Sequence, residues 1–191
     1  GEGLALDGDG TLLISGYSTS PWGTPVRAYA GSYDTFVARL APDGALHWNT
    51  FLGGTGVDSA IGVRPTPAGI VVAGTSNTTW GTPLRSYTAA NDFFVAALNA
   101  TGGLTWNTFL GGAGHDSANR MSTSADGTVH VIGYSSTTWG TPVTGFAGGD
   151  DTVVVAVDPA GTLVWMTFLG GSGLDFGNGI VDDNAGHLFV V

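Results

Sequence analysis

One unit of about 59 residues occurs three times in this chain of 191 residues, and no other feature limits the possible folds as strongly. The segment Trp-Gly-Thr-Pro recurs at spacings of 58 and 59 residues, beginning at Trp22, Trp80 and Trp139. Two further blocks keep these spacings: Trp-x-Thr-Phe-Leu-Gly-Gly begins at Trp48, Trp106 and Trp165, and Gly-Gly-x-Gly-x-Asp ends at Asp58, Asp116 and Asp175. Three markers in one register exclude coincidence. We therefore divide the chain into units 1–59, 60–117 and 118–176 and a partial unit, 177–191.

Each unit is predicted to contain four short strands. In the second unit these are residues 61–64, 70–73, 92–98 and 104–109, separated by Gly, Pro, Asn, Asp and Ser. Short turns such as Asp126-Gly127 join the first strand to the second and the third to the fourth, because Asp and Gly tolerate the positive φ of tight hairpins. The scarcity of Glu and Lys, which are common on helix surfaces, also favours an all-β protein.

The third strand of the second unit is apolar on both faces. One face carries Phe94, Ala96 and Leu98, and the other carries Phe93, Val95 and Ala97. A sheet with one face in water would alternate apolar and polar residues, so this sheet must be covered on both sides. Four-stranded antiparallel blades stacked face to face form a β-propeller, whereas a β-solenoid has a much shorter repeat. Closed propellers have about four to eight blades, so we expect further repeats or a second copy to complete the ring.

Composition excludes several classes of function. The net charge of −10, with five Arg and no Lys, excludes a nucleic-acid partner, because phosphate neutralisation requires basic side chains. No apolar stretch is long enough to span a membrane, so membrane insertion is not expected. The absence of Cys excludes disulfides, thiolate metal sites and cysteine nucleophiles.

The run Thr-Phe-Leu-Gly-Gly-Ser-Gly-Leu-Asp-Phe-Gly-Asn-Gly-Ile at 167–180 resembles the SBBP (seven-bladed β-propeller) repeat. The segment at 92–99 is similar to the third strand of that repeat, and the resemblance recurs in every unit. It implies a seven-bladed ring in a secreted or surface-attached bacterial or archaeal protein, and it supplies no catalytic residues. The Trp-Gly-Thr-Pro segment departs from the family, which often has Phe-Pro-x-Thr there.

Repeated Trp and Asp residues form the candidate binding site. In a propeller, the loops that contain them emerge on one face, so an indole could stack on a sugar ring while a carboxylate accepts its hydroxyl groups. The candidate glycan-binding residues are Trp22, Trp80, Trp139, Asp58, Asp116 and Asp175. The alternative is structural: each Trp fills the groove between blades, and each Asp accepts hydrogen bonds from backbone N–H groups of the Gly-rich turn.

Other repeated residues are interpreted as structural. Trp48, Trp106 and Trp165 are expected to pack within the blades, and Asp34, Asp92 and Asp151 to cap turns. The segment Asp7-Gly8-Asp9-Gly10 is similar to a calcium loop, but the other units lack it, so we interpret it as a hairpin turn and keep calcium as an alternative. Asn77 and Asn99 begin glycosylation sequons.

No catalytic residues are predicted, because the four His residues occupy non-equivalent positions and only one Glu is present. The sequence therefore predicts a non-enzymatic scaffold, outside the cell or at its surface, that is structural or adhesive and assembles through its incomplete blades. Its expected partners are copies of itself, further repeats of the same polypeptide, or glycans. A glycan-binding lectin and the propeller domain of a larger secreted enzyme are the alternatives.

Overall fold

The computed structural model describes residues 2–191, which form β-strands and connecting loops without a helix. Gly1, the first residue of the first expected unit, lies outside the described residues. The fourteen strands are β1 (Gly3–Leu6), β2 (Leu12–Ser18), β3 (Asp34–Leu40), β4 (Leu46–Leu52), β5 (Asp58–Thr66), β6 (Gly69–Ser76), β7 (Asp92–Leu98), β8 (Leu104–Leu110), β9 (Asp116–Thr123), β10 (Val129–Ser135), β11 (Asp151–Val157), β12 (Leu163–Leu169), β13 (Ile180–Asp182) and β14 (Leu188–Val190). Accordingly, the described part of the chain contains no helix long and apolar enough to cross a membrane.

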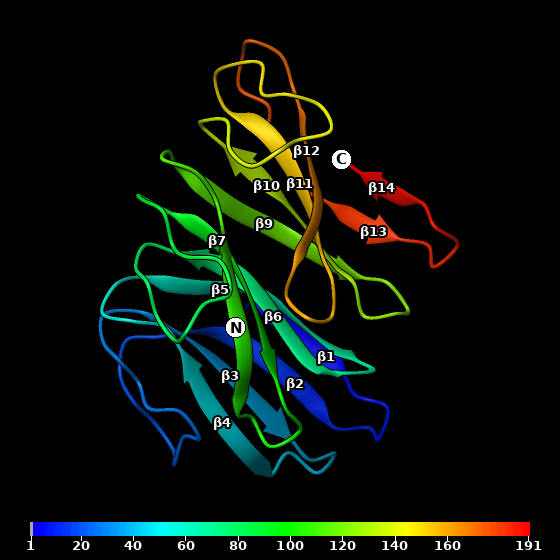
Figure 1. The fold of residues 1–191 in the computed structure, drawn as a ribbon. Coiled ribbons are helices and arrows are strands. Elements are labelled where there is room, and N and C mark those ends of the chain that lie inside the picture. The colour runs from blue at the N-terminus through cyan, green and yellow to red at the C-terminus, as the bar shows by residue number, and fades with distance from the viewer. Residues whose placement is uncertain (1) are drawn as a thin grey trace.

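The strands form three four-stranded antiparallel sheets in chain order, followed by the hairpin β13–β14. Figure 1 shows the sheets following one another from the first, in blue and cyan, to the third, which runs from yellow-green to orange. The predicted all-β fold and tandem four-stranded units are thus confirmed. In the second unit, the predicted third strand coincides with β7, while the predicted first and second strands extend to the longer β5 and β6.

The same irregularity occurs in every four-stranded sheet, where the third strand approaches the turn to the fourth. The register there shifts by a bulge between Arg39 and Leu40, between Ala97 and Leu98, and between Ala156 and Val157. A bulge bends its strand and increases the local twist. The three sheets therefore share their local curvature as well as their strand order.

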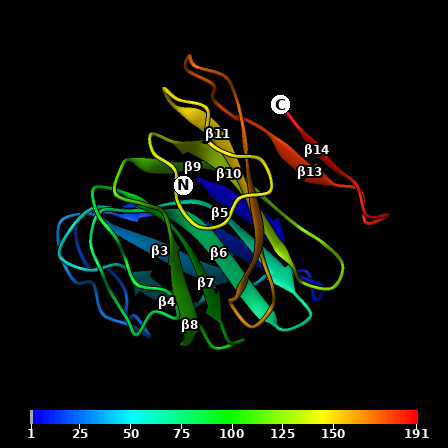
Figure 2. The ribbon, with the colours of Figure 1, turned by 45° about the horizontal axis from the view of Figure 1, so that its top comes forward.

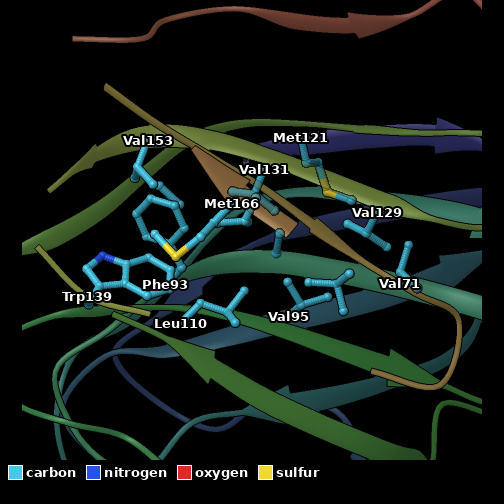
Figure 3. Packing of buried hydrophobic residues seen from close by; sticks show 14 of the residues in the cluster. Val71, Phe93, Val95, Leu110, Met121, Val129, Val131, Trp139, Val153 and Met166 are labelled. Atoms are coloured by element: carbon cyan, nitrogen blue, oxygen red, sulfur yellow. The ribbon is translucent and has the colours of Figure 1, made fainter. Parts of the chain in front are cut away.

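Apolar side chains between successive sheets form two cores. The first contains Leu13 and Val37 of the first sheet together with Phe94 of β7. The second contains Phe93 of the same strand, together with Val131 and other residues of the third sheet (Figure 3). Adjacent residues of β7 thus enter different cores, as the apolar character of both its faces predicts. Neither face of the second sheet has to be solvated.

The contacts between sheets are concentrated on their first strands. β5 contacts β1, β2 and β3 of the first sheet, β9 contacts β5, β6 and β7 of the second sheet, and β9 in turn contacts β13. The fourth strands β4, β8 and β12 make their extensive strand contacts only with the third strand of their own sheet. In Figure 2 the hairpin β13–β14, in red, lies beside the third sheet.

A second contact links each fourth strand to the following unit. Trp48 on β4 donates a hydrogen bond from Nε1 to the carbonyl oxygen of Ala100, at 3.0 Å, in the turn between β7 and β8. Trp106 on β8 does the same to Pro159, at 3.2 Å. The indole of Trp48 lies against Gly102, where an added Cβ would come within 2.7 Å of Cε3. These tryptophans therefore pack between units, whereas the sequence predicted packing within a blade.

This contact predicts different costs for one substitution at two equivalent glycines. Gly102 and Gly44 both have positive φ, +82° and +88°, but a Cβ at Gly44 meets no atom within 4 Å. Gly44→Ala should lower the free energy of unfolding by about 1 kcal/mol through backbone strain alone. Gly102→Ala adds overpacking against Trp48 and should cost about 2–4 kcal/mol. Urea unfolding followed by tryptophan fluorescence measures both, and equal losses would contradict the packing argument.

Candidate functional site

The structure brings two of the predicted Trp and Asp pairs together at the junctions between sheets. Trp80 lies in the loop between β6 and β7, and Asp58 is the first residue of β5. Gly54 contacts both: its N–H donates to Asp58 Oδ2 at 2.9 Å, and its α-carbon faces Thr79 and Trp80. Trp139, Asp116 and Gly112 repeat this arrangement in the third unit. Trp22 in the first unit and Asp175 at the end of the third unit each lack the second member of such a pair within residues 2–191.

The indole of Trp80 is enclosed on all sides. Only 5% of its surface is exposed. Its ring meets those of Phe94 and Phe109 edge-on, at centroid distances of 5.3 and 5.7 Å. The guanidinium of Arg27, from the preceding unit, lies 5.6 Å above the indole. A sugar ring could stack on Trp80 only if the junction between the first and second units opened.

Trp139 is enclosed in the same way at the second junction, and Figure 3 shows it beside Leu110 of the preceding sheet. Its exposed fraction is 6%, and Arg85 lies 5.3 Å above its ring. Trp22, at the equivalent position of the first unit, is only half-buried. The geometry at Trp80 and Trp139 matches the structural alternative, in which the indoles fill grooves between units. Glycan binding by these residues stays a prediction.

Arg27 and Arg85 hold the junctions from the preceding unit. Arg27 donates hydrogen bonds to the carbonyl oxygens of Phe51, at 2.8 Å, and Gly53, at 2.9 Å. Arg85 makes the same two bonds to Phe109 and Gly111. Each arginine thus connects the Trp-Gly-Thr-Pro loop of its unit to the end of the fourth strand of the same sheet. The face of its guanidinium group covers the indole of the Trp-Gly-Thr-Pro segment in the next unit.

The sequence analysis did not identify these arginines, although the repeat contains a signal for them. Each stands five residues after the Trp of its Trp-Gly-Thr-Pro segment, and the third unit has Thr144 at that position. The signal was incomplete because only two of three units contain it. Cation–π stacking between units also cannot be inferred from spacing alone.

Pairs of carboxylates surround one glycine at each junction. A Cβ added at Gly53 would lie 2.6 Å from Asp34 Oδ1 and 2.8 Å from Asp58 Oδ2, so no larger residue fits between them. Asp34 Oδ2 accepts a hydrogen bond from the N–H of Ala30 at 2.7 Å, which confirms the predicted turn cap. Asp58 also accepts a bond from the hydroxyl of Ser76.

The same arrangement recurs in the other two units. Asp92 and Asp151 accept bonds from the N–H groups of Thr88 and Ala147, at 2.8 and 2.6 Å. Their Oδ1 atoms are buried without a hydrogen-bond partner in the described residues, and so is that of Asp34.

Burial raises the pKa of Asp58 and of Asp92. It raises the pKa of Asp58 to about 6, opposed by the bonds from Ser76 and Gly54 and increased further by the nearby charge of Asp34. It also raises the pKa of Asp92 to about 6, and the neighbouring Asp116 adds to the shift. Arg85 lowers the pKa of Asp92 and Asp116, so the guanidinium partly compensates for the buried negative charge.

The remaining predicted residues lie outside the junctions. Asp7 and Asp9 lie in the hairpin turn between β1 and β2, as predicted, and both pair with Arg39, at 3.0 and 2.7 Å. Asn99 also lies in a turn, where its Oδ1 accepts from the N–H groups of Thr101 and Gly103. Asn77 Oδ1 accepts from the N–H of Val57.

Within residues 2–191 no three His, Asp or Glu side chains are grouped as metal ligands, and the expectation about calcium stays untested. No family model matches this chain, and no curated protein matches it either. The resemblance to the SBBP repeat therefore stays a prediction.

Loss of a junction arginine should destabilise the fold. Arg85→Met removes two charge-assisted hydrogen bonds and the stacking on Trp139, and we expect the free energy of unfolding to fall by about 2–4 kcal/mol. Chemical denaturation at pH 7 measures the change. Arg120→Met, at an exposed side chain whose guanidinium donates one hydrogen bond to the carbonyl oxygen of Asn119, should cost about 1 kcal/mol or less. A similar loss in the two variants would contradict the role of Arg85.

The buried carboxylates predict a stability that falls as the pH rises. A pKa of about 6 in the folded state exceeds the usual value of about 4 in the unfolded chain. The stabilisation is therefore complete below pH ~4 and is lost as the pH rises through 6. We expect the Tm to fall between pH 5 and 7.5, and to fall less in Asp92→Asn. Asp43→Asn, in an exposed turn, should keep the wild-type dependence, and identical profiles for both variants would contradict the assignment.

Proposed function

We propose that this chain is the repeat region of a non-enzymatic β-propeller scaffold that works outside the cell or at its surface. In this arrangement each four-stranded sheet is one blade, and the first strands surround a central axis. The blades display loops and turns at their rims as a surface for partners, which are glycans, further repeats or other copies of the chain.

The distribution of contacts between sheets carries the proposal. The first strand of each later four-stranded sheet makes extensive contacts with the first three strands of the sheet before it, whereas the fourth strands make no extensive contacts with another sheet. Sheets that approach at one edge and separate at the other radiate from a line, as blades do. Trp48 and Trp106 span the wider separation at the outer edge through their large indole rings.

The side chains repeated in every unit support a structural role. Four of the six Trp and Asp residues that resemble a binding site, Trp80, Trp139, Asp58 and Asp116, are buried at the junctions. There they meet aromatic rings, guanidinium groups and backbone N–H groups. Because the recurring side chains pack one unit against the next, the surface positions that differ between units are available for recognition of partners.

Charge supports the surface location. The chain has a net charge of −10, with no Lys and no Cys. Few residues of the chain are charged, but most of these are acidic, so the molecules repel one another and stay soluble. A fold without thiols also needs no reducing environment. Antibody labelling of intact producing cells tests the location, and labelling only after lysis would contradict it.

Distances between spin labels distinguish a propeller from a linear stack of sheets. The chain has no Cys, so two labels can be placed freely. One pair, Gly8→Cys and Ala125→Cys, marks the turns after the first strands of units one and three. The other pair, Asp43→Cys and Ala160→Cys, marks the outer turns before the fourth strands. We expect the outer pair to give the longer distance in pulsed dipolar EPR, because blades diverge outward.

All four labelled positions are exposed, so the labels should not disturb the cores. Melting curves of the labelled proteins control for this. Equal distances for the two pairs would indicate a linear stack and would overturn the propeller.

A further inference from the structure

A cavity of about 320 Å³ lies beside the first strands of the three sheets. Its lining includes Gly3 on β1, Gly62 and Arg64 on β5, and Arg120 and Met121 on β9. These strands follow one another in space, each in contact with the next (Figure 1). The volume is at the lower end of the range for small-molecule sites and suits a single monosaccharide or a smaller ion.

The two arginines of this cavity have no acidic partner. Each guanidinium donates one hydrogen bond, to the backbone carbonyl of the preceding residue: Arg64 to Val63 at 2.9 Å and Arg120 to Asn119 at 2.8 Å. Among residues 2–191, no carboxylate lies within ion-pairing distance of either group, although Glu2 lines the same cavity. The lack of a carboxylate partner is unexpected, because the chain has fifteen acidic residues for five arginines.

These arginines are also departures from the repeat. Ser122 stands in the third unit where the second has Arg64, and Gly62 stands in the second unit where the third has Arg120. The arginines that hold the junctions, Arg27 and Arg85, recur at equivalent positions instead. The packing of one repeat on the next therefore does not require Arg64 or Arg120.

Two positive groups that line one cavity repel each other, and an anion between them converts this repulsion into two attractions. Guanidinium groups also match the oxygen geometry of carboxylate and phosphate, with two parallel N–H donors each. We propose that this cavity is a binding site for a small oxyanion, held by Arg64 and Arg120. The site goes beyond the proposed scaffold role and does not depend on closure of a propeller ring.

The ligand can be a carboxylate, as on an acidic sugar, or a phosphate. The shared chemistry is a compact group of negatively charged oxygens with room for little else. Met121 and Ile61 supply apolar contact area for the carbon atoms of a sugar acid, whereas a free phosphate would use the guanidinium groups alone.

The two methionines of the chain provide a direct probe. Both methionines are buried in the core between the second and third sheets, and Met121 also lines the cavity whereas Met166 does not. In protein labelled with 13C at the methionine methyl groups, titration with glucuronate or inorganic phosphate should shift the Met121 signal and leave Met166 unchanged. Glucose, which has the ring without the charge, should shift neither. All titrations are made at constant ionic strength and pH.

Variants assign the binding to the arginines. Arg64→Gln and Arg120→Gln should each weaken binding about ten-fold or more, since each removes one charge-assisted pair. Arg39→Gln, which makes the same change of charge elsewhere, should leave the Kd unchanged. The Met166 signal shows in each case that the core between the second and third sheets is intact.

A response to glucuronate alone identifies a carboxylate site, and a response to phosphate alone identifies a phosphate site. The proposal is overturned if neither anion shifts Met121, if glucose shifts it as much as glucuronate does, or if binding survives both Arg64→Gln and Arg120→Gln.

Discussion

The burial of both faces of each central strand determines the remainder of this structure. Phe93 and Phe94 are neighbours on β7, yet each is fully buried in a different core. A sheet of this kind exposes apolar area to water on whichever side lacks a neighbour. Successive sheets must therefore stack, and the unit that repeats in the sequence is also the unit that cannot be stable alone.

Stacking creates a second requirement, because the loops at each junction contain polar groups that lose water. Carboxylates such as Asp92 and Asp116 are fully buried and lie near each other, which is costly for charged groups. Backbone N–H donors and the nearby Arg85 stabilise the charged form of both groups. Burial still raises the pKa of both carboxyl groups, that of Asp92 to about 6. The recurring spacing of Trp, Arg and Asp in the chain thus follows from one packing requirement, which both junctions meet in the same way.

Much of the fold was predictable from the sequence, because the spacing of apolar residues reflects which side chains are buried. The unbroken run of apolar residues at 93–98 predicted a strand covered on both faces, and the spacing of three motifs predicted tandem sheets of four strands. The direction of the strand-four tryptophans was not predictable: Trp48 bonds to Ala100 in the next unit, and spacing cannot distinguish packing within a unit from packing between units. The site was less predictable still. Arg64 and Arg120 interrupt the repeat, so a search for recurring residues passes over them, and only the arrangement of β5 and β9 places both on one cavity.

The junctions also explain why their cations are arginine rather than lysine. Arg27 uses two nitrogen atoms to bond the carbonyl oxygens of Phe51 and Gly53 while its flat face covers Trp80. An ammonium group is a compact point charge and cannot bridge two carbonyl groups while it stacks on a ring. Burial lowers the pKa of Arg27, yet a guanidinium has a pKa high enough to stay charged there, whereas a buried ammonium readily loses its proton. At these two positions, geometry and charge retention together exclude Lys.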